Sequence, residues 1–257
     1  MNEFDKDVES NIKRLGESEE LQRLGNEFLV KTAGYRYSYN FSWMGRPIIQ
    51  YPQDMVAMQE IIWNVKPDLI IETGIAHGGS LIYYASILEM LSIAGLSEGK
   101  ILGIDIDIRE HNRTAIEEHP MFRRIDMIQG SSIAPDIVRQ VRERAKGCPN
   151  IMVVLDSNHT HDHVLAELEA YAPLVSIGSY CVVFDTVVED MPEGSFPDRP
   201  WDVGDNPKTA VWDFLKKTDA GGVHDEQGGA VRFEIDRSVE HKLLVTVAPD
   251  GYLKRTG

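Results

Sequence analysis

From residue 68 onward, the sequence alternates short runs of β-branched and other apolar residues with stretches of helical spacing. This alternation is typical of a mostly parallel β-sheet whose strands are joined by crossover helices. The predicted strands lie at residues 68–72, 101–105, 124–130, 151–156 and 180–185. We therefore predict an α/β fold.

The sequence after these strands predicts an addition to the sheet. Residues 230–236 and 241–255 form two more apolar runs, which we interpret as an antiparallel strand pair at the sheet edge. Residues 188–207 are rich in Pro, Gly and acidic residues, and this loop is long enough to be an active-site lid.

The first sixty residues follow a different pattern. They begin with an acidic stretch that predicts a helix, and residues 55–67 again have helical spacing. Between them, aromatic residues occupy every second position from Tyr35 to Trp43. That spacing indicates either a half-buried strand or a wall over a ring-shaped or sugar substrate. We divide the chain into residues 1–60, which supply an interface or an acceptor wall, and residues 61–257, which form the main domain.

Composition excludes several classes of protein. With 26 Lys and Arg against 41 Asp and Glu, the formal charge is −15, so the chain would repel a nucleic acid backbone or an anionic membrane surface. The two cysteines, Cys148 and Cys181, cannot build a disulfide scaffold, which favours a reducing, cytoplasmic setting. No export signal and no apolar run of about 18 residues is present, so we expect neither secretion nor anchoring.

Acidic residues end four of the predicted strands. Glu72 closes the first, Asp105 the second, Asp156 the fourth and Asp185 the fifth. Ligands of open α/β sheets bind outside the carboxyl ends of the strands. We therefore expect the four acids to converge on one crevice.

The first strand leads into a glycine loop, Glu72-Thr73-Gly74-Ile75-Ala76-His77-Gly78-Gly79-Ser80, followed by a long helix. Glycines let the backbone approach a ligand, and the helix N-terminus adds a positive dipole end. A dinucleotide fingerprint would place Gly at the position of Ala76, and the carboxylate of Glu72 would repel phosphates. The loop thus favours a cationic ligand without phosphate, such as S-adenosylmethionine, over NAD.

Two later positions suit an adenosine ligand. Asp105 is placed to accept hydrogen bonds from a ribose diol, a role shared by sites for NAD and S-adenosylmethionine. Ser132, in the run Gly130-Ser131-Ser132 after the third strand, either borders the adenine or belongs to an ordinary turn.

Asp156 and Asp185 follow strands that should be neighbours, and two carboxylates at strand ends can hold Mg²⁺. The hydroxyl of Thr186 would complete the ligand set, and Glu189 or Asp190 are the alternatives unless they are solvated loop acids. A bound Mg²⁺ would lower the pKa of a substrate hydroxyl, as methyl transfer to oxygen requires.

Three histidines follow Asp156 within seven residues. His159 lies at the expected crevice edge, where it could take the hydroxyl proton. His159 and His163 also share a helix face at i, i+4, which leaves a two-histidine iron site as an alternative.

The combined motifs resemble the cephalosporin hydroxylase family. They are GRPIIQYPQDM, IIETGIAHGGS, ILGIDIDIR, VLDSNHTHDHVLAELEAYAPLV and VVFDTVVEDMP. The resemblance implies a Rossmann-like class I methyltransferase fold, with residues 61–257 as the S-adenosylmethionine-binding catalytic domain. It also implies Mg²⁺-dependent O-methylation of antibiotics or of sugars such as rhamnosyl groups, and an oligomer.

The family's architecture is similar to that of catechol O-methyltransferase, which implies roles for individual residues. Glu72, Gly74 and Ser80, within a loop that includes Ala76 and Gly79, match the positions that bind the methionine end of the cofactor. Asp105 matches the ribose position and Ser132 lies near the adenine position. Asp156 and Asp185 match metal positions, Thr186 replaces an Asn ligand, and His159 replaces a Lys base.

We therefore predict a cytoplasmic, Mg²⁺-dependent O-methyltransferase that uses S-adenosylmethionine and acts on a hydroxyl of a small, sugar-bearing molecule. The alternatives are an NAD-dependent oxidoreductase on a similar sheet, an iron-dependent hydroxylase, and a cofactor-binding or assembly protein with an inactive site. The expected partners are a small-molecule acceptor and further copies of the chain, without nucleic acid or membrane.

Overall fold

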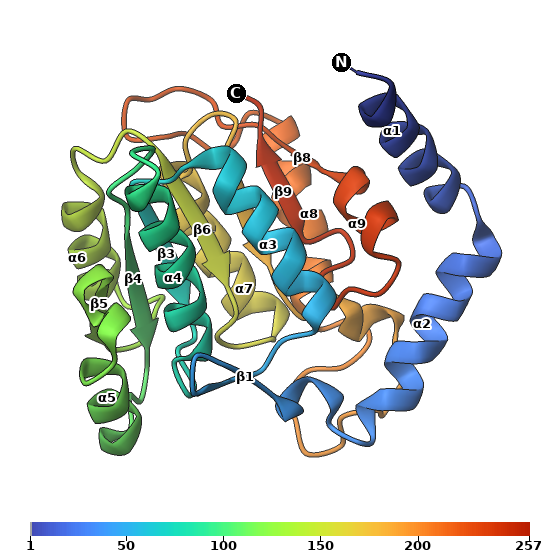
Figure 1. Cartoon of the computed structure of the whole chain (residues 1–257), viewed down its shortest axis with the longest axis horizontal. Helices are drawn as coiled ribbons and strands as arrows, with labels where there is room; N and C mark the ends of the chain where they lie inside the picture. The colour runs from blue at the N-terminus through green and yellow to red at the C-terminus, as the bar shows by residue number, and fades with distance from the viewer. Residues whose placement is uncertain (1) are drawn as a thin grey trace.

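A seven-stranded sheet with the order β5-β4-β3-β6-β7-β9-β8 forms the centre of the computed structural model, which describes residues 2–257 (Figure 1). The parallel strands are β3 (Leu69–Thr73), β4 (Lys100–Asp105), β5 (Ile125–Gln129), β6 (Ile151–Leu155) and β7 (Tyr180–Val183). At the edge, β9 (Tyr252–Arg255) runs antiparallel to β7 and to β8 (Phe233–Ile235). The predicted α/β fold with a mostly parallel sheet and an antiparallel C-terminal pair is confirmed.

Helices cover both faces of the sheet because its buried strands are apolar on both sides. Ile70 packs into one core cluster and the adjacent Ile71 into another, as expected when successive side chains point to opposite faces. The first cluster includes residues of α3 (Pro52–Val65), α4 (Gly79–Ile93), α5 (Glu110–Glu117) and α9 (Arg237–Leu243). The second includes residues of α6 (Pro135–Ala145), α7 (His161–Tyr171) and α8 (Pro207–Asp219). Short 3-10 helices lie at η1 (Tyr37–Asn40), η2 (Pro120–Arg124), η3 (Ala172–Leu174) and η4 (Thr186–Asp190).

The N-terminal helices α1 (Glu3–Gly16) and α2 (Glu19–Ala33) run along one side of the molecule (Figure 1). Helix α1 packs on α9, and Leu29 of α2 lies in a small apolar cluster with Tyr51. The predicted boundary at residue 60 falls inside α3, where Met58 and Ile62 both belong to the first core cluster.

The aromatic run from Tyr35 to Trp43 is not the continuous strand that its spacing predicts. The backbone of Arg36 takes a left-handed conformation (φ 52°), and η1 follows it. Only β1 (Phe41–Trp43) is extended, and it pairs with β2 (Arg46–Ile48). Rings of Phe28, Phe41 and Tyr51 surround Tyr37 at centroid distances of 5.1 to 5.5 Å, so packing between distant aromatic residues overrides the local alternation.

The predicted strand at residues 241–255 is also shorter than expected. Its first residues complete α9, and only Tyr252–Arg255 form β9. The intervening segment is held by the buried carboxylate of Asp54, which accepts hydrogen bonds from the backbone N–H of Val247 (3.0 Å) and from the Thr246 hydroxyl. These tertiary contacts replace the sheet hydrogen bonds that an extended strand would make. None of the helices within residues 2–257 has both the length and the apolar character needed to cross a membrane.

Candidate active site

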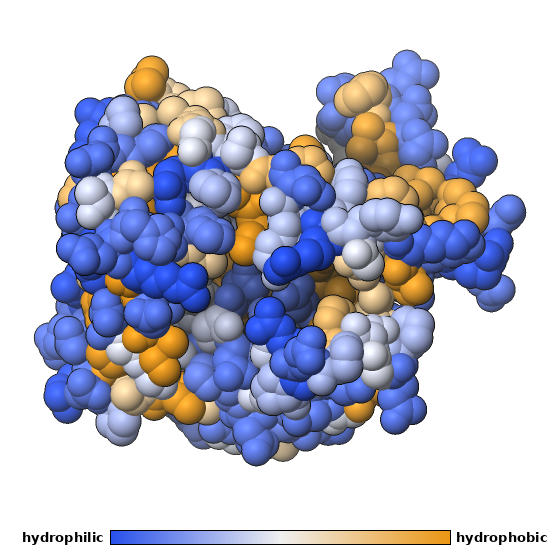
Figure 2. All heavy atoms as spheres, turned by 90° about the horizontal axis from the view of Figure 1, so that it is seen from below, coloured by the Kyte–Doolittle hydropathy of each residue, from blue (hydrophilic) through white to orange (hydrophobic). Residues whose placement is uncertain are grey.

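The carboxyl ends of the parallel strands meet at one end of the molecule, the lower end in Figure 1. Asp156 follows β6 and Asp185 lies just beyond the paired strand β7, while Glu72 is in β3 and Asp105 ends β4. A cavity of about 590 Å³ lies here, between the glycine loop, the segment before α3 and the loop 191–206. Figure 2 views the molecule from this side and shows a recess with hydrophilic residues near the middle of the face.

Asp156, His159 and Asp185 form the candidate metal centre. Each offers one ligand atom, and these atoms lie within 4.8 Å of one another. The His159 Nε2 atom is 3.3 Å from the Asp185 Oδ2 atom. Two carboxylates and an imidazole are a suitable donor set for a divalent cation. Asp185 adopts a left-handed backbone conformation (φ 56°), which is uncommon for a residue with a side chain and turns it at the strand end.

The crowding of acids changes the protonation of this centre. Burial raises the pKa of Asp156 well above its usual range, and the neighbouring carboxylates of Asp185 and Glu72 raise it further. A cation would offset this repulsion because it stabilises both ionised carboxylates.

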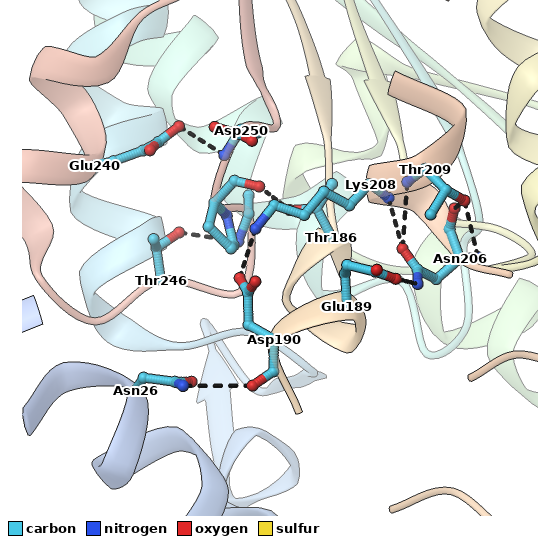
Figure 3. A network of polar contacts seen from close by, with 12 residues as sticks. Asn26, Thr186, Glu189, Asp190, Asn206, Lys208, Thr209, Glu240, Thr246 and Asp250 are labelled. Atoms are coloured by element: carbon cyan, nitrogen blue, oxygen red, sulfur yellow. Dashed lines mark hydrogen bonds and ion pairs between the residues drawn. The ribbon is translucent and has the colours of Figure 1, made fainter. Parts of the chain in front are cut away.

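The three residues considered as a further metal ligand are engaged elsewhere, as Figure 3 shows. The hydroxyl of Thr186 is buried and donates to the Pro249 carbonyl oxygen at 2.6 Å. Glu189 accepts hydrogen bonds from the Gly204 N–H (2.8 Å) and from the Asn206 side chain. Asp190 accepts from the Lys208 Nζ atom at 2.6 Å. His159, rather than any of these, stands beside the two aspartates.

The glycine loop lies directly against the metal centre. Gly74 has a positive φ of 93°, and an added Cβ would come within 2.0 Å of the Asp156 carbonyl oxygen. The Asp105 Oδ2 atom accepts hydrogen bonds from the backbone N–H groups of Ile75 (2.8 Å) and Ala76 (3.2 Å). Asp105 therefore orders the loop. Gly79 begins α4 and is equally constrained, because a Cβ there would lie 2.1 Å from the Pro47 carbonyl oxygen.

Glu72 is an unsatisfied carboxyl group beneath this loop. It is fully buried, and neither carboxylate oxygen has a partner in good hydrogen-bond geometry among the described residues, although the nearby Ser80 hydroxyl lowers its pKa in part. Burial raises the pKa of Glu72 to about 8. A buried polar group without a partner is costly, so this position suits a bound ligand with a donor or a positive charge.

Ser132 and His163 belong to a separate polar network. Their Oγ and Nε2 atoms are 3.1 Å apart, and His163 also lies 3.4 Å from the Ser157 hydroxyl. His163 is thus not part of the metal group, which holds one histidine and two carboxylates. The two-histidine iron alternative gains no support from this arrangement.

Three apolar residues were not anticipated from the sequence: Trp201, which lines the cavity, and two isoleucines that follow predicted site residues. Ile106 and Ile133 directly follow Asp105 and Ser132, and their side chains are 72% and 39% exposed. Apolar residues exposed just after two strand ends are the signal that would have revealed them. Trp201, in the loop predicted as a lid, packs edge-to-face on His159 with ring centroids 4.7 Å apart. Nothing in the local sequence predicts that contact.

A Rossmann-like parallel sheet with an antiparallel edge pair and a ligand loop after its first parallel strand defines the class I methyltransferase fold. A solved structure of CmcI with Mg and SAM has this fold, with a TM-score of 0.55 to this chain at 15% identity, covering 85% of this chain and 78% of that chain. A family model for Rhamnosyl O-methyltransferase/CmcI matches residues 35–256. The chain therefore belongs to this family of O-methyltransferases, which confirms the resemblance drawn from the motifs.

Curated relatives are similar over much of the chain. Rhamnosyl O-methyltransferase of Mycobacterium leprae is 32% identical over 152 residues, which cover 59% of this chain and 62% of that protein. Rhamnosyl O-methyltransferase of Mycobacterium tuberculosis strain H37Rv is 29% identical over 215 residues, which cover 83% of this chain and 78% of that protein.

Proposed function

We propose that this protein transfers a methyl group from S-adenosylmethionine to a hydroxyl of a small, sugar-bearing acceptor in a Mg²⁺-dependent reaction. One observation carries the proposal: Asp156, His159 and Asp185 converge beside a glycine loop that covers a buried, unpartnered Glu72. The family membership supports it, as do the names of the mycobacterial relatives and the CmcI structure with Mg and SAM.

The residues around the glycine loop fit S-adenosylmethionine. The cofactor's amino acid portion is cationic at its amino group, and it would give Glu72 the partner that this buried carboxyl group lacks. Gly74, Ala76, Gly79 and Ser80 bring the loop backbone and the start of α4 close to that portion.

The adenosine portion has its own candidate residues. Asp105 orders the loop and keeps acceptor capacity for the ribose hydroxyls. Ile106 and Ile133 would enclose the adenine ring beside Ser132, because these exposed isoleucines directly follow Asp105 and Ser132 in the sequence.

Asp156 and Asp185 would hold Mg²⁺, with His159 as their neighbour. When bound, the cofactor supplies an electrophilic methyl group and the cation lowers the pKa of the acceptor hydroxyl. We assign the acceptance of the hydroxyl proton to His159, whose Nε2 atom lies 3.3 Å from the Asp185 Oδ2 atom beside the candidate metal centre. Trp201 packs against the imidazole and lines the cavity, where it would restrict the access of water.

The first test is calorimetric titration of the full-length protein with S-adenosylmethionine, with and without Mg²⁺, and with NAD for comparison. We expect micromolar binding of S-adenosylmethionine and none of NAD. In a methyl-transfer assay with rhamnosides, Asp185→Asn should lose at least about a hundredfold in rate while S-adenosylmethionine still binds, because a pair of carboxylates is needed to hold the cation.

An acidic residue of α7 offers a matched control for Asp185→Asn. Asp162 is an exposed acid three residues beyond His159 and outside the metal group, so Asp162→Asn should keep the activity of the unmodified protein. Binding of NAD in place of S-adenosylmethionine, or undiminished turnover in excess chelator, would disprove the proposal.

The proposal includes three statements about the protein's surroundings. We place it in the cytoplasm, as a homo-oligomer, without nucleic acid or membrane partners. The net charge of −15 supports the last statement.

A further inference from the structure

Two arginines that are far apart in the sequence line the same cavity. Arg36 precedes η1 in the N-terminal segment, and Arg199 lies in the loop between η4 and α8. The metal centre occupies another part of the same cavity wall. The cavity wall therefore contains both a pair of carboxylates and two guanidinium groups.

Both arginines stack on aromatic rings that also line the cavity. The Arg36 guanidinium carbon lies 4.3 Å from the centroid of the Tyr39 ring, and the Arg199 guanidinium carbon lies 5.2 Å from that of Trp201. Within residues 2–257, neither guanidinium forms an ion pair with an acidic side chain. Stacking limits the motion of each group while leaving its N–H donors free for a ligand.

The charge of the cavity differs from that of the chain. The chain carries a net charge of −15, yet among residues 2–257 only two acids, Asp156 and Asp185, line the cavity. A divalent cation would neutralise these two carboxylates, and S-adenosylmethionine adds a sulfonium. Arg36 and Arg199 then leave the acceptor region with a net positive charge, which a neutral sugar would not use.

We propose that the acceptor carries an anionic group, a phosphate or a carboxylate, which Arg36 and Arg199 bind by charge-assisted hydrogen bonds. This inference rests on the proposed function and narrows its substrate class from sugar-bearing molecules to acidic ones. The two arginines belong to different segments, so the anion would also link the N-terminal segment to the loop that carries Trp201.

The test compares three probes that share one ring: glucose, glucuronate and glucose 1-phosphate. Each is titrated calorimetrically into the full-length protein loaded with S-adenosylhomocysteine and Mg²⁺. We expect at least one charged probe to bind about tenfold or more tightly than glucose, because hydrogen bonds to charged groups are the stronger ones. If glucuronate binds more tightly, the anionic group is a carboxylate, and if glucose 1-phosphate does, it is a phosphate.

The double variant Arg36→Gln/Arg199→Gln should abolish that preference. Arg139→Gln is the matched control, because Arg139 is an exposed arginine outside this cavity, and it should retain the preference. Melting curves of all variants check that they fold.

Three outcomes would overturn the inference. Glucose could bind as tightly as the charged probes do, or none of the three probes could bind. Alternatively, the preference could survive in the double variant, which would assign the anion to the metal ion and not to the arginines. A protein that fails to bind S-adenosylhomocysteine would instead contradict the proposed function.

Discussion

The buried carboxyl group of Asp54 and the largely buried one of Glu240 hold the chain before β9 in place. The Asp54 carboxylate accepts hydrogen bonds from the Val247 N–H (3.0 Å) and the Tyr252 hydroxyl (2.7 Å), and burial raises its pKa to about 6. Glu240 accepts from the Asp250 N–H at 2.6 Å, and burial raises its pKa to about 7. Both groups are thus easier to bury protonated than ionised.

Glu240→Gln should remove one pH-dependent contribution to stability. The pKa of Glu240 is higher in the folded state, so its contribution is fully present below the ordinary value of 4.5 and is lost as the pH rises through about 7. Relative to the unmodified protein, the variant should gain on the order of 3 kcal/mol in unfolding free energy between these pH values. Urea unfolding at pH 4.5, 6 and 7.5 measures this difference.

The exposed residue Glu118 offers a control for that measurement. Glu118→Gln should change the unfolding free energy by nearly the same amount at each pH. If the difference between Glu240→Gln and the unmodified protein does not change with pH, then Glu240 does not titrate in this range in the folded state.

At the scale of elements, one residue starts α8 and also ties down the lid. Asn206 is fully buried, and its side-chain oxygen accepts from the N–H groups of Lys208 (3.0 Å) and Thr209 (3.4 Å). Its side-chain nitrogen donates to Glu189 and to the Asp202 carbonyl oxygen, as seen in part in Figure 3. The loop that carries Arg199 and Trp201 is therefore closed by the N-cap of the helix that follows it.

Asn206→Ala should lower the unfolding free energy by about 2 kcal/mol, since it removes a helix cap and leaves the partly buried Glu189 carboxylate with one donor fewer. Asn2 forms the corresponding capping box on the exposed helix α1. Asn2→Ala should therefore cost less than about 1 kcal/mol. Chemical denaturation compares the two variants, and equal costs would show that the contacts to the lid contribute nothing.

At the scale of the molecule, the two N-terminal helices extend from α9 to the cavity. Helix α1 packs on α9, while Leu29 and Ala33 of α2 line the cavity. Gly25 allows α2 to approach the body, because an added Cβ would lie 2.0 Å from the Leu244 carbonyl oxygen. Apolar side chains such as Phe4 and Leu24 stay exposed on this arm, which projects at the upper right of Figure 2.

Gly25→Ala should displace α2 and raise the KM for the acceptor several-fold, because α2 contributes Leu29 and Ala33 to the cavity wall. The affinity for S-adenosylmethionine should stay unchanged. A lower melting temperature should accompany the change. Glu20→Ala is the control, because Glu20 is an exposed residue of the same helix that does not line the cavity. Steady-state kinetics and calorimetry separate the two effects, and a joint loss of cofactor binding would contradict this assignment.

The sequence by itself determined the sheet, and it determined which end of the sheet carries the candidate site. Apolar runs and helical spacing are local properties, and in parallel strands the residues that follow them must meet at one edge. Glu72, Asp105, Asp156 and Asp185 were therefore expected in one crevice, but only Asp156 and Asp185 line the cavity, while Asp105 binds the backbone of the glycine loop. The glycine loop was equally readable, since a conformation such as that of Gly74 and its approach to Asp156 favour a residue without a side chain.

Only the tertiary structure decided which side chains face the cavity. Thr186 is adjacent to Asp185 in sequence, yet its hydroxyl binds the carbonyl of Pro249. The aromatic spacing before β1 gave way to packing around Tyr37. Arg36 and Arg199 line one cavity although 163 positions separate them. The direction of a side chain depends on contacts with residues that are distant in sequence. A local sequence pattern cannot predict those contacts.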